Sequence, residues 1–312
     1  ADEGLPHPKV DGPWNLEAAR RVVEEWQSRY ADQSQFYLAA RNPEELYDGV
    51  QYAERAGVKD VYLFTDTWHA DAGFWPQASL NWAVNKKVFP RGEADLRAFS
   101  DHVASKGMHV KIHWVSGGIP FRDPHYILPK LDDRLATWVS GTLAEAVDAE
   151  AATLLFKPGP GAREKVEEAV VHRHGIPSFV RVGDELIQVG SFANTDADVW
   201  ELTGCSRGVS GTPVSDHAAD AGLVGLVTPY NIVFTPDVDS TLLDEMAEGF
   251  AGLVNRCRIM NVEFDGFEIH GYAGRWGCEK FGAKVYASLD HTVSSNTSGG
   301  SAPRCWIEYR RN

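Results

Sequence analysis

The stretch EADLRAFSDHVASKG, residues 93–107, leads directly into MHVKIHWV, residues 108–115, and these two segments decide the fold. Apolar residues recur at helical spacing in the first segment, which ends in a glycine, and the second is a short run of strand formers. A helix that returns the chain directly to a buried strand is typical of βα units, in which helices cover a parallel sheet. The sequence therefore predicts an α/β fold.

The same alternation continues on both sides of this stretch. Helical patterns cover residues 15–31, 42–58, 239–257 and 275–289, and strand patterns cover residues 35–41, 59–66, 259–270 and 292–298. Asn15 and Asn42 are the expected N-caps of the first two helices, and Asp239 or Ser240 is that of the third. Five strands in βα order predict a (β/α) barrel of the TIM type, which this chain can contain in incomplete form because eight strands close such a barrel.

The middle of the chain has a different pattern, with alternating apolar residues and many glycines, which predicts short antiparallel strands. We expect residues 1–150 to form the first part of the barrel, residues 151–235 a β-rich insertion, and residues 236–312 the continuation of the barrel. Within the insertion, residues 178–227 resemble small β modules of phage tail and surface proteins. This resemblance rests on Arg207-Gly208, Gly211-Thr212 and His217. Such a module serves either packing through tight turns or substrate binding.

Composition excludes some partners. The net charge of −14 argues against nucleic acid, because phosphate binding needs a basic face. No apolar stretch approaches the roughly 18–20 residues of a membrane span. The four cysteines lack metal-type spacing and are compatible with disulfides without requiring them. The polar, proline-rich start indicates either a cytoplasmic protein or a mature chain after signal-peptide removal, and we expect the second, a secreted or periplasmic protein.

Polar side chains gather at the ends of three predicted strands. In parallel βα folds, sites form at the carboxyl edge of the sheet. One strand runs into Asp66, Trp68, His69 and Asp71, the next ends in His113 and Trp114, and a third ends in EFDGFEIHG, residues 263–271. Three such ends at one edge predict a functional site.

Strand alternation assigns faces within this last stretch. It places Phe267 and Ile269 on a face that packs under helices, and it points Glu268 and His270 into the mouth of the barrel. Asp265 shares the face of Phe267, where it either bonds to a helix or has a role of its own.

The motifs VYLFTDTW, VFPRGEADLRAFSDHVASKGMHVKIHW and VEFDGFEIH resemble, in order and spacing, the α-galactosidase-like superfamily of glycoside hydrolases. The resemblance implies a (β/α)8 barrel and places Asp66 and Trp68 where that family binds sugar hydroxyls. It places Glu268 at the lysine of a strand that ends in a lysine and a nucleophilic aspartate, and His270 at that aspartate. Because both positions differ, the mechanism of the family does not transfer directly, and Glu268 is the nearest carboxylate that could act.

The predicted function is therefore a glycoside hydrolase that acts on a poly- or oligosaccharide. Glycosidic cleavage generally needs two carboxyl groups that flank the bond. The predicted catalytic residues are Glu268, Asp66, His270 and Glu308. Glu308 lies next to arginines, which favour an ionised carboxylate, and it fits a surface ion pair equally well. The predicted substrate-binding residues are Trp68, His69, Asp71, His113, Trp114, Arg275 and Trp276, with the tryptophans as stacking surfaces.

Three other functions fit the same residues. His69, His113 and His270, with Asp66 or Glu268, could bind a divalent metal in a barrel hydrolase. A polysaccharide lyase would use a histidine as base and Arg275 to neutralise a uronate. A carbohydrate-binding or assembly protein would use the β-rich insertion without catalysis. We expect a carbohydrate as the partner and neither a metal nor another cofactor in the site.

Overall fold

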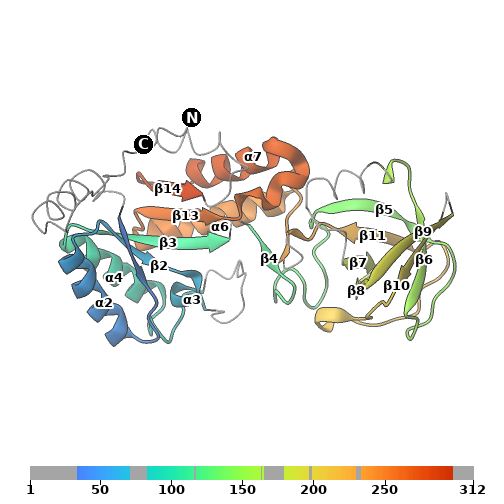
Figure 1. Ribbon diagram of the computed structural model, residues 1–312, viewed down its shortest axis with the longest axis horizontal. Helices are drawn as coiled ribbons and strands as arrows, with labels where there is room; N and C mark the ends of the chain where they lie inside the picture. The colour runs from blue at the N-terminus through green and yellow to red at the C-terminus, as the bar shows by residue number, and fades with distance from the viewer. Residues whose placement is uncertain are drawn as a thin grey trace, which may run out of the picture.

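A five-stranded parallel sheet and a seven-stranded antiparallel sheet make up the two parts of the molecule (Figure 1). The computed structural model describes residues 34–70, 83–115, 117–162, 164, 179–196, 199–229 and 233–297. The expected helix at residues 15–31 lies outside these ranges. The strands of the parallel sheet, in their order across it, are β1 (Gln35–Leu38), β2 (Asp60–Leu63), β3 (His109–Val115), β13 (Asn261–Asp265) and β14 (Ser294–Thr297).

Helices follow these strands as the βα pattern predicts. They are α2 (Pro43–Ala56), α3 (Thr65–Trp68), α4 (Glu93–Ser105), α6 (Thr241–Cys257) and α7 (Gly274–Ala287). The Asn42 side chain accepts a 2.9 Å hydrogen bond from the Glu45 amide, and Gly57 ends α2 with φ of 69°. Ser240 caps α6 through the Leu242 amide. The predicted caps of these two helices are confirmed, with Ser240 rather than Asp239 at α6.

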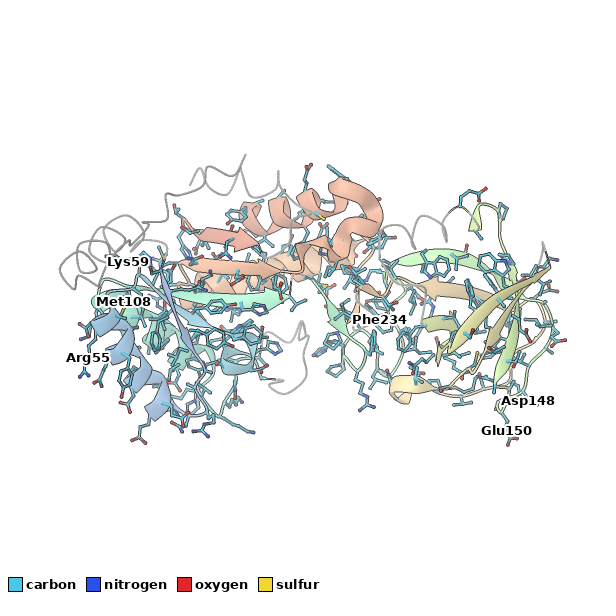
Figure 2. All side chains as sticks on the ribbon, viewed as in Figure 1. Arg55, Lys59, Met108, Asp148, Glu150 and Phe234 are labelled. Carbon is cyan, nitrogen blue, oxygen red and sulfur yellow. The ribbon has the colours of Figure 1, made fainter. Side chains whose placement is uncertain are left out.

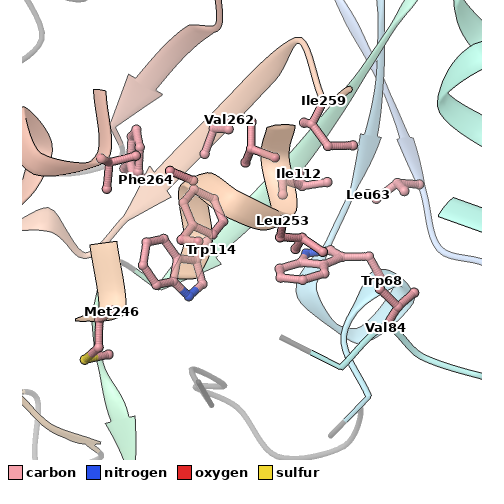
Figure 3. Packing of buried hydrophobic residues seen from close by; sticks show 14 of the residues in the cluster. Leu63, Trp68, Val84, Ile112, Trp114, Met246, Leu253, Ile259, Val262 and Phe264 are labelled. Atoms are coloured by element: carbon pink, nitrogen blue, oxygen red, sulfur yellow. The ribbon is translucent and has the colours of Figure 1, made fainter. Parts of the chain in front are cut away.

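Alternation along the strands gives the parallel sheet two unlike faces. One face is apolar and packs on the helices: Figure 3 shows Ile112, Trp114, Val262 and Phe264 of the sheet together with Met246 and Leu253 of α6. The indole ring of Trp114 stacks on the ring of Phe250 from α6, with centroids 3.9 Å apart. The opposite face carries Lys111, His113, Glu263 and Asp265, so burial of one face fixes which side chains reach the other.

The antiparallel sheet has its own core. Its strands, in their order across it, are β8 (Glu185–Gln188), β7 (Phe179–Val182), β11 (Gly222–Leu226), β5 (Thr137–Leu143), β6 (Thr153–Pro158), β10 (Val199–Thr203) and β9 (Ser191–Asp196). A two-stranded link of β4 (Ile119–Pro120) and β12 (Val233–Phe234) joins the two parts. Phe234 of this link lies between the parts (Figure 2), with its ring 4.8 Å from that of Phe121 and 5.5 Å from that of Phe179.

The structure corrects one predicted strand end. The sheet of the β-rich unit begins with β5 at Thr137 and ends with β11 at Leu226, and the expected insertion bounds of residues 151 and 235 stay a prediction. The predicted strand at 259–270 is shorter: β13 ends at Asp265, and the 3-10 helix η4 (Phe267–Ala273) follows. Gly266 has φ of 62°, a left-handed conformation that ends the strand. The parallel order is confirmed, whereas the described strands form an open sheet with β1 and β14 at its edges rather than a closed barrel.

A buried carboxylate organises the turns of the β-rich unit. The side chain of Glu185 is fully buried and accepts hydrogen bonds from Arg207 Nε at 2.7 Å, Arg207 Nη2 at 2.8 Å and His217 Nε2 at 2.7 Å. The Gly208 amide also donates to it. Burial by itself raises the pKa of Glu185, but the hydrogen bonds from Arg207 and His217 outweigh burial and hold the pKa below its usual range. Arg207, Gly208 and His217 therefore have a structural role, because all three bind the buried carboxylate of Glu185. The likeness to phage modules stays a prediction.

Replacing Glu185 with Gln is expected to destabilise the protein by ~3–5 kcal/mol, because Arg207 would keep a buried charge without its partner. Asp184→Asn is the matched control: the Asp184 side chain is 54% exposed and pairs with the exposed Lys130, so we expect a change within about 1 kcal/mol. Denaturant unfolding at neutral pH measures both. Equal stability of the two variants would contradict the role of Glu185.

The lowered pKa of Glu185 also predicts the sign of the pH dependence. A depressed carboxyl pKa contributes stability that is fully present above its unfolded value of about 4.3 and is lost as the pH falls through the folded value. Acid unfolding followed from pH 6 downward should therefore show a steeper loss of stability in the wild type than in Glu185→Gln. Parallel curves for the two proteins would contradict the assignment.

Candidate active site

The carboxyl ends of β2, β3 and β13 lie at one edge of the parallel sheet, on the side where Figure 1 shows the β-rich unit. The register pairs His113 with Glu263 and Val115 with Asp265. Because the strands are parallel and in register, odd-numbered side chains of β3 and β13 share the polar face. The site is therefore built from two neighbouring strands and from α3, which directly follows β2.

His113 is the centre of this edge. Its ring is buried, with Nε2 3.1 Å from Oδ2 of Asp265 and Nδ1 2.5 Å from Oγ1 of Thr65. The Phe64 ring stacks on it with centroids 4.2 Å apart. The indole N–H of Trp68 donates to the backbone oxygen of His113 at 2.8 Å. The imidazole is thus fixed on both nitrogens and on one face, while the Asp265 side chain keeps 25% exposure.

A second polar group lies deeper on the same face. The ammonium of Lys111 is 2.7 Å from Oε1 of Gln35 and 3.6 Å from Oε2 of Glu263, and it lies 5.1 Å from the centre of the Tyr62 ring. Burial lowers the pKa of Lys111, against the opposing effect of Glu263 and Asp60. Burial raises the pKa of Asp60, whose carboxylate accepts a hydrogen bond from the Asn261 amide group.

Two predicted stacking residues are core residues instead. Trp68 and Trp114 are both 0% exposed, Trp68 against the backbone of β3 and Trp114 against Phe250. This burial contradicts their predicted role as sugar-stacking surfaces. Trp276 is 59% exposed on α7, beside Lys280, and keeps a face that could stack on a ring.

The other two histidines predicted for the site, His69 and His270, are buried among other residues. His69 is 1% exposed at the end of α3 and forms an isolated bridge with Val84. His270 is 0% exposed in η4, with its ring stacked on that of Phe281 and Nδ1 3.3 Å from Oγ1 of Thr235. The alternation that pointed His270 into a barrel mouth was wrong, because η4 is not a strand.

Only part of the predicted site falls within the residues and side chains that the structure describes. Asp66 is exposed on α3, next to the buried Thr65. Asp71 and Glu308 lie outside the described residues, and so do the side chains of Glu268 and Arg275. Their roles stay predictions. The structure brings His113 together with three residues that were not proposed for the site: Asp265, Glu263 and Lys111. Strand alternation could have identified Asp265 if it had been counted within residues 261–265 alone, because it places Asp265 on the same face as Glu263.

The described residues contain no group of three or more His, Cys, Asp or Glu that could hold a metal ion. His113 and Asp265 approach each other as a pair, and the other two predicted histidines lie elsewhere in the core. None of the helices within the described ranges is long and apolar enough to cross a membrane.

No protein-family model and no curated protein sequence matches the chain. Several solved structures match, among them two α-galactosidases and an isomaltulose synthase. An α-galactosidase from Lactobacillus brevis is 13% identical with a TM-score of 0.37, and the match covers 86% of this chain and 26% of that one. A GH36 α-galactosidase variant from Geobacillus stearothermophilus, in complex with stachyose, is 11% identical with a TM-score of 0.44 and coverages of 86% and 27%. An isomaltulose synthase from Klebsiella sp. LX3 is 9% identical with a TM-score of 0.41 and coverages of 84% and 43%.

The chain spans less than half the length of each of these solved structures. The resemblance to α-galactosidases that the sequence indicated is confirmed as a resemblance. No residue role and no substrate follows from likenesses at this level of identity and TM-score.

Chelation provides a test of the metal-dependent alternative. Because the described residues of the site pair one histidine with one carboxylate rather than gathering several ligands, dialysis against EDTA is expected to leave activity and thermal unfolding unchanged. Metal analysis of the purified protein before and after dialysis is the accompanying measurement. Loss of a stoichiometric zinc or manganese together with activity would decide for the metal-dependent hydrolase.

Proposed function

We propose that the chain acts on carbohydrate as a glycoside hydrolase, and that Asp265 is a carboxylate of its catalytic pair. The observation that carries this proposal is the position of Asp265. It is the last residue of a parallel strand, it is partly exposed at the carboxyl edge of the sheet, and a buried histidine of the neighbouring strand holds one of its oxygens. Sites of βα folds form at this edge.

Because β13 ends at Asp265, different residues of this chain correspond to the α-galactosidase-like pattern. That pattern has a strand ending in a lysine and a nucleophilic aspartate. With β13 ending at Asp265, Glu263 and Asp265 take these two positions in place of Glu268 and His270. The aspartate is then present, and the lysine is replaced by Glu263. The ammonium of Lys111, 3.6 Å from Glu263, brings a positive charge to the same place from the adjacent strand.

The contact between Asp265 and His113 suits the carboxylate that acts as nucleophile or base in glycosidic cleavage. A carboxylate in contact with a histidine N–H is stabilised as the ion, which is the form that attacks an anomeric carbon or accepts a proton from water. The other half needs a carboxylic acid that gives its proton to the leaving oxygen. Glu268, one turn after Asp265, remains our proposed residue for that role, and Asp66, Asp71 and Glu308 are the other candidates in the chain.

The test of the function is a screen of oligo- and polysaccharides with products analysed by mass. A hydrolase adds one water for each bond cleaved, whereas a lyase yields an unsaturated sugar that absorbs in the ultraviolet. A protein that binds glycans in the same screen and releases no product would be a binding or assembly protein. Only the first result supports the proposal.

Two variants separate the candidate carboxylates. Asp265→Asn is expected to lower kcat by about 10²–10⁴-fold, because it removes the charge while keeping the shape of the side chain. Glu268→Gln is expected to lower kcat within the same range if Glu268 supplies the proton, and Asp184→Asn is the control for a distant exposed carboxylate. Near-normal turnover in Asp265→Asn would mean that Asp265 only holds His113.

A further inference from the structure

Asp265 is one end of a chain of hydrogen bonds through three elements of the fold. Oδ2 of Asp265 in β13 lies 3.1 Å from Nε2 of His113 in β3, and Nδ1 of His113 lies 2.5 Å from Oγ1 of Thr65 in α3. The hydroxyl of Thr65 also lies 3.3 Å from the backbone oxygen of His113. Thr65 is 0% exposed and His113 is 2% exposed, so protein atoms supply these contacts.

The Thr65 hydroxyl can satisfy His113 in both of its protonation states. A neutral ring with its proton on Nε2 donates to Asp265 and accepts the Thr65 proton at Nδ1. An imidazolium donates from both nitrogens, so Thr65 must accept at Nδ1 and turn its own proton elsewhere. The backbone oxygen of His113 is the acceptor for that proton. A buried ring can therefore gain or lose a proton here without leaving a donor or acceptor unpaired, a condition that costs free energy in most buried sites.

From this geometry we infer that Thr65 is a positioning residue that allows His113 to take up and release a proton beside Asp265. The inference rests on the proposed role of Asp265 in catalysis. A substrate that covers the strand ends excludes water, and an imidazolium at Oδ2 then keeps the carboxylate ionised in place of water. When a proton must leave Asp265, a neutral ring in its other tautomer, with its proton on Nδ1 and donated to Thr65, can accept it at Nε2.

Other charged groups near His113 are already paired. Glu263 on β13 is the register partner of His113, and Lys111 lies two residues before His113 on the same face of β3. The ammonium of Lys111 lies 3.6 Å from the carboxylate of Glu263. Tyr62 presents its ring edge-on at 6.3 Å, and Phe64 covers the ring of His113. Asp265 is therefore the charged group that acts on the proton of His113 most directly.

The experiment is ¹⁵N NMR of histidine side chains in the full chain, because these shifts distinguish the two neutral tautomers and the imidazolium. The His113 signals are assigned by their loss in His113→Gln. We expect the neutral form of the ring in the wild type to carry its proton mainly on Nε2, next to Asp265. We expect Thr65→Val to lower the ratio of imidazolium to neutral ring about tenfold at a given pH, the effect of losing one hydrogen bond to a charged group. Thr65→Ser keeps the hydroxyl and should restore the wild-type ratio.

Thr67→Val is the matched control, because Thr67 is also buried in α3 but donates to the backbone oxygen of Leu38 instead of to His113. It should leave the His113 signals unchanged. Asp265→Asn provides a second measurement, with an expected fall in the imidazolium ratio even if Thr65→Val fails to fold. Unchanged His113 spectra in Thr65→Val would overturn the inference, and so would unchanged spectra in Asp265→Asn where Thr65→Val does not fold.

Activity assays on the same proteins separate this inference from the proposed function. If the wild type cleaves glycans, Thr65→Val should lower kcat and change the pH profile while KM stays the same, and Thr65→Ser should recover both. If the NMR results are as expected and no glycan is cleaved, the hydrogen-bond chain stands and the glycosidase proposal fails. Loss of activity in Thr65→Val without any change in the His113 spectra would overturn the positioning role.

Discussion

The alternation of side chains along β3 is the constraint on which the rest of the structure depends. Ile112 and Trp114 must be buried against α6, and this burial forces Lys111 and His113 onto the opposite face. A shift of one residue would place an ammonium and an imidazole in an apolar core. The same register pairs β3 with β13 and brings Asp265 to His113. Core packing thus determines the geometry of the polar site.

Local signals in the sequence were enough to predict most of the α/β part. Asn42, Pro43 and Gly57 act within a few residues of their own positions, and a helix pattern with such ends needs no information about distant contacts. The parallel order followed from the βα alternation. The strand end at Asp265 did not, because the left-handed turn at Gly266 can be recognised only once the chain is known to leave the sheet there. The sequence analysis therefore considered Glu268 rather than Asp265 as the carboxylate at the end of this strand.

The polar edge of the sheet could be predicted from the sequence, but the contacts within it could not. Polar residues at strand ends indicated the edge where His113 and Asp265 meet. Trp68 and Trp114 looked like ligand-binding aromatics because sequence alone does not distinguish a tryptophan that faces a helix from one that faces solvent. The pairing of His113 with Asp265 joins residues 152 positions apart in the chain, a contact that no local pattern contains. The Glu185 network is similar, since its members come from separate turns that meet only after the strands pair.

The link of β4 and β12 has a consequence for removal of the β-rich unit. Ile119 pairs with Phe234 and Pro120 with Val233, so the chain leaves the parallel sheet and returns to it at neighbouring points. A segment whose ends lie side by side can be added to a host fold, or removed from it, without pulling its strands apart. The β-rich unit has a second hydrophobic cluster, while Phe179, Leu186 and Leu226 of its sheet belong to the cluster of the parallel part. A variant with a short β4–β12 hairpin in place of the whole unit is therefore expected to keep the order of the parallel strands.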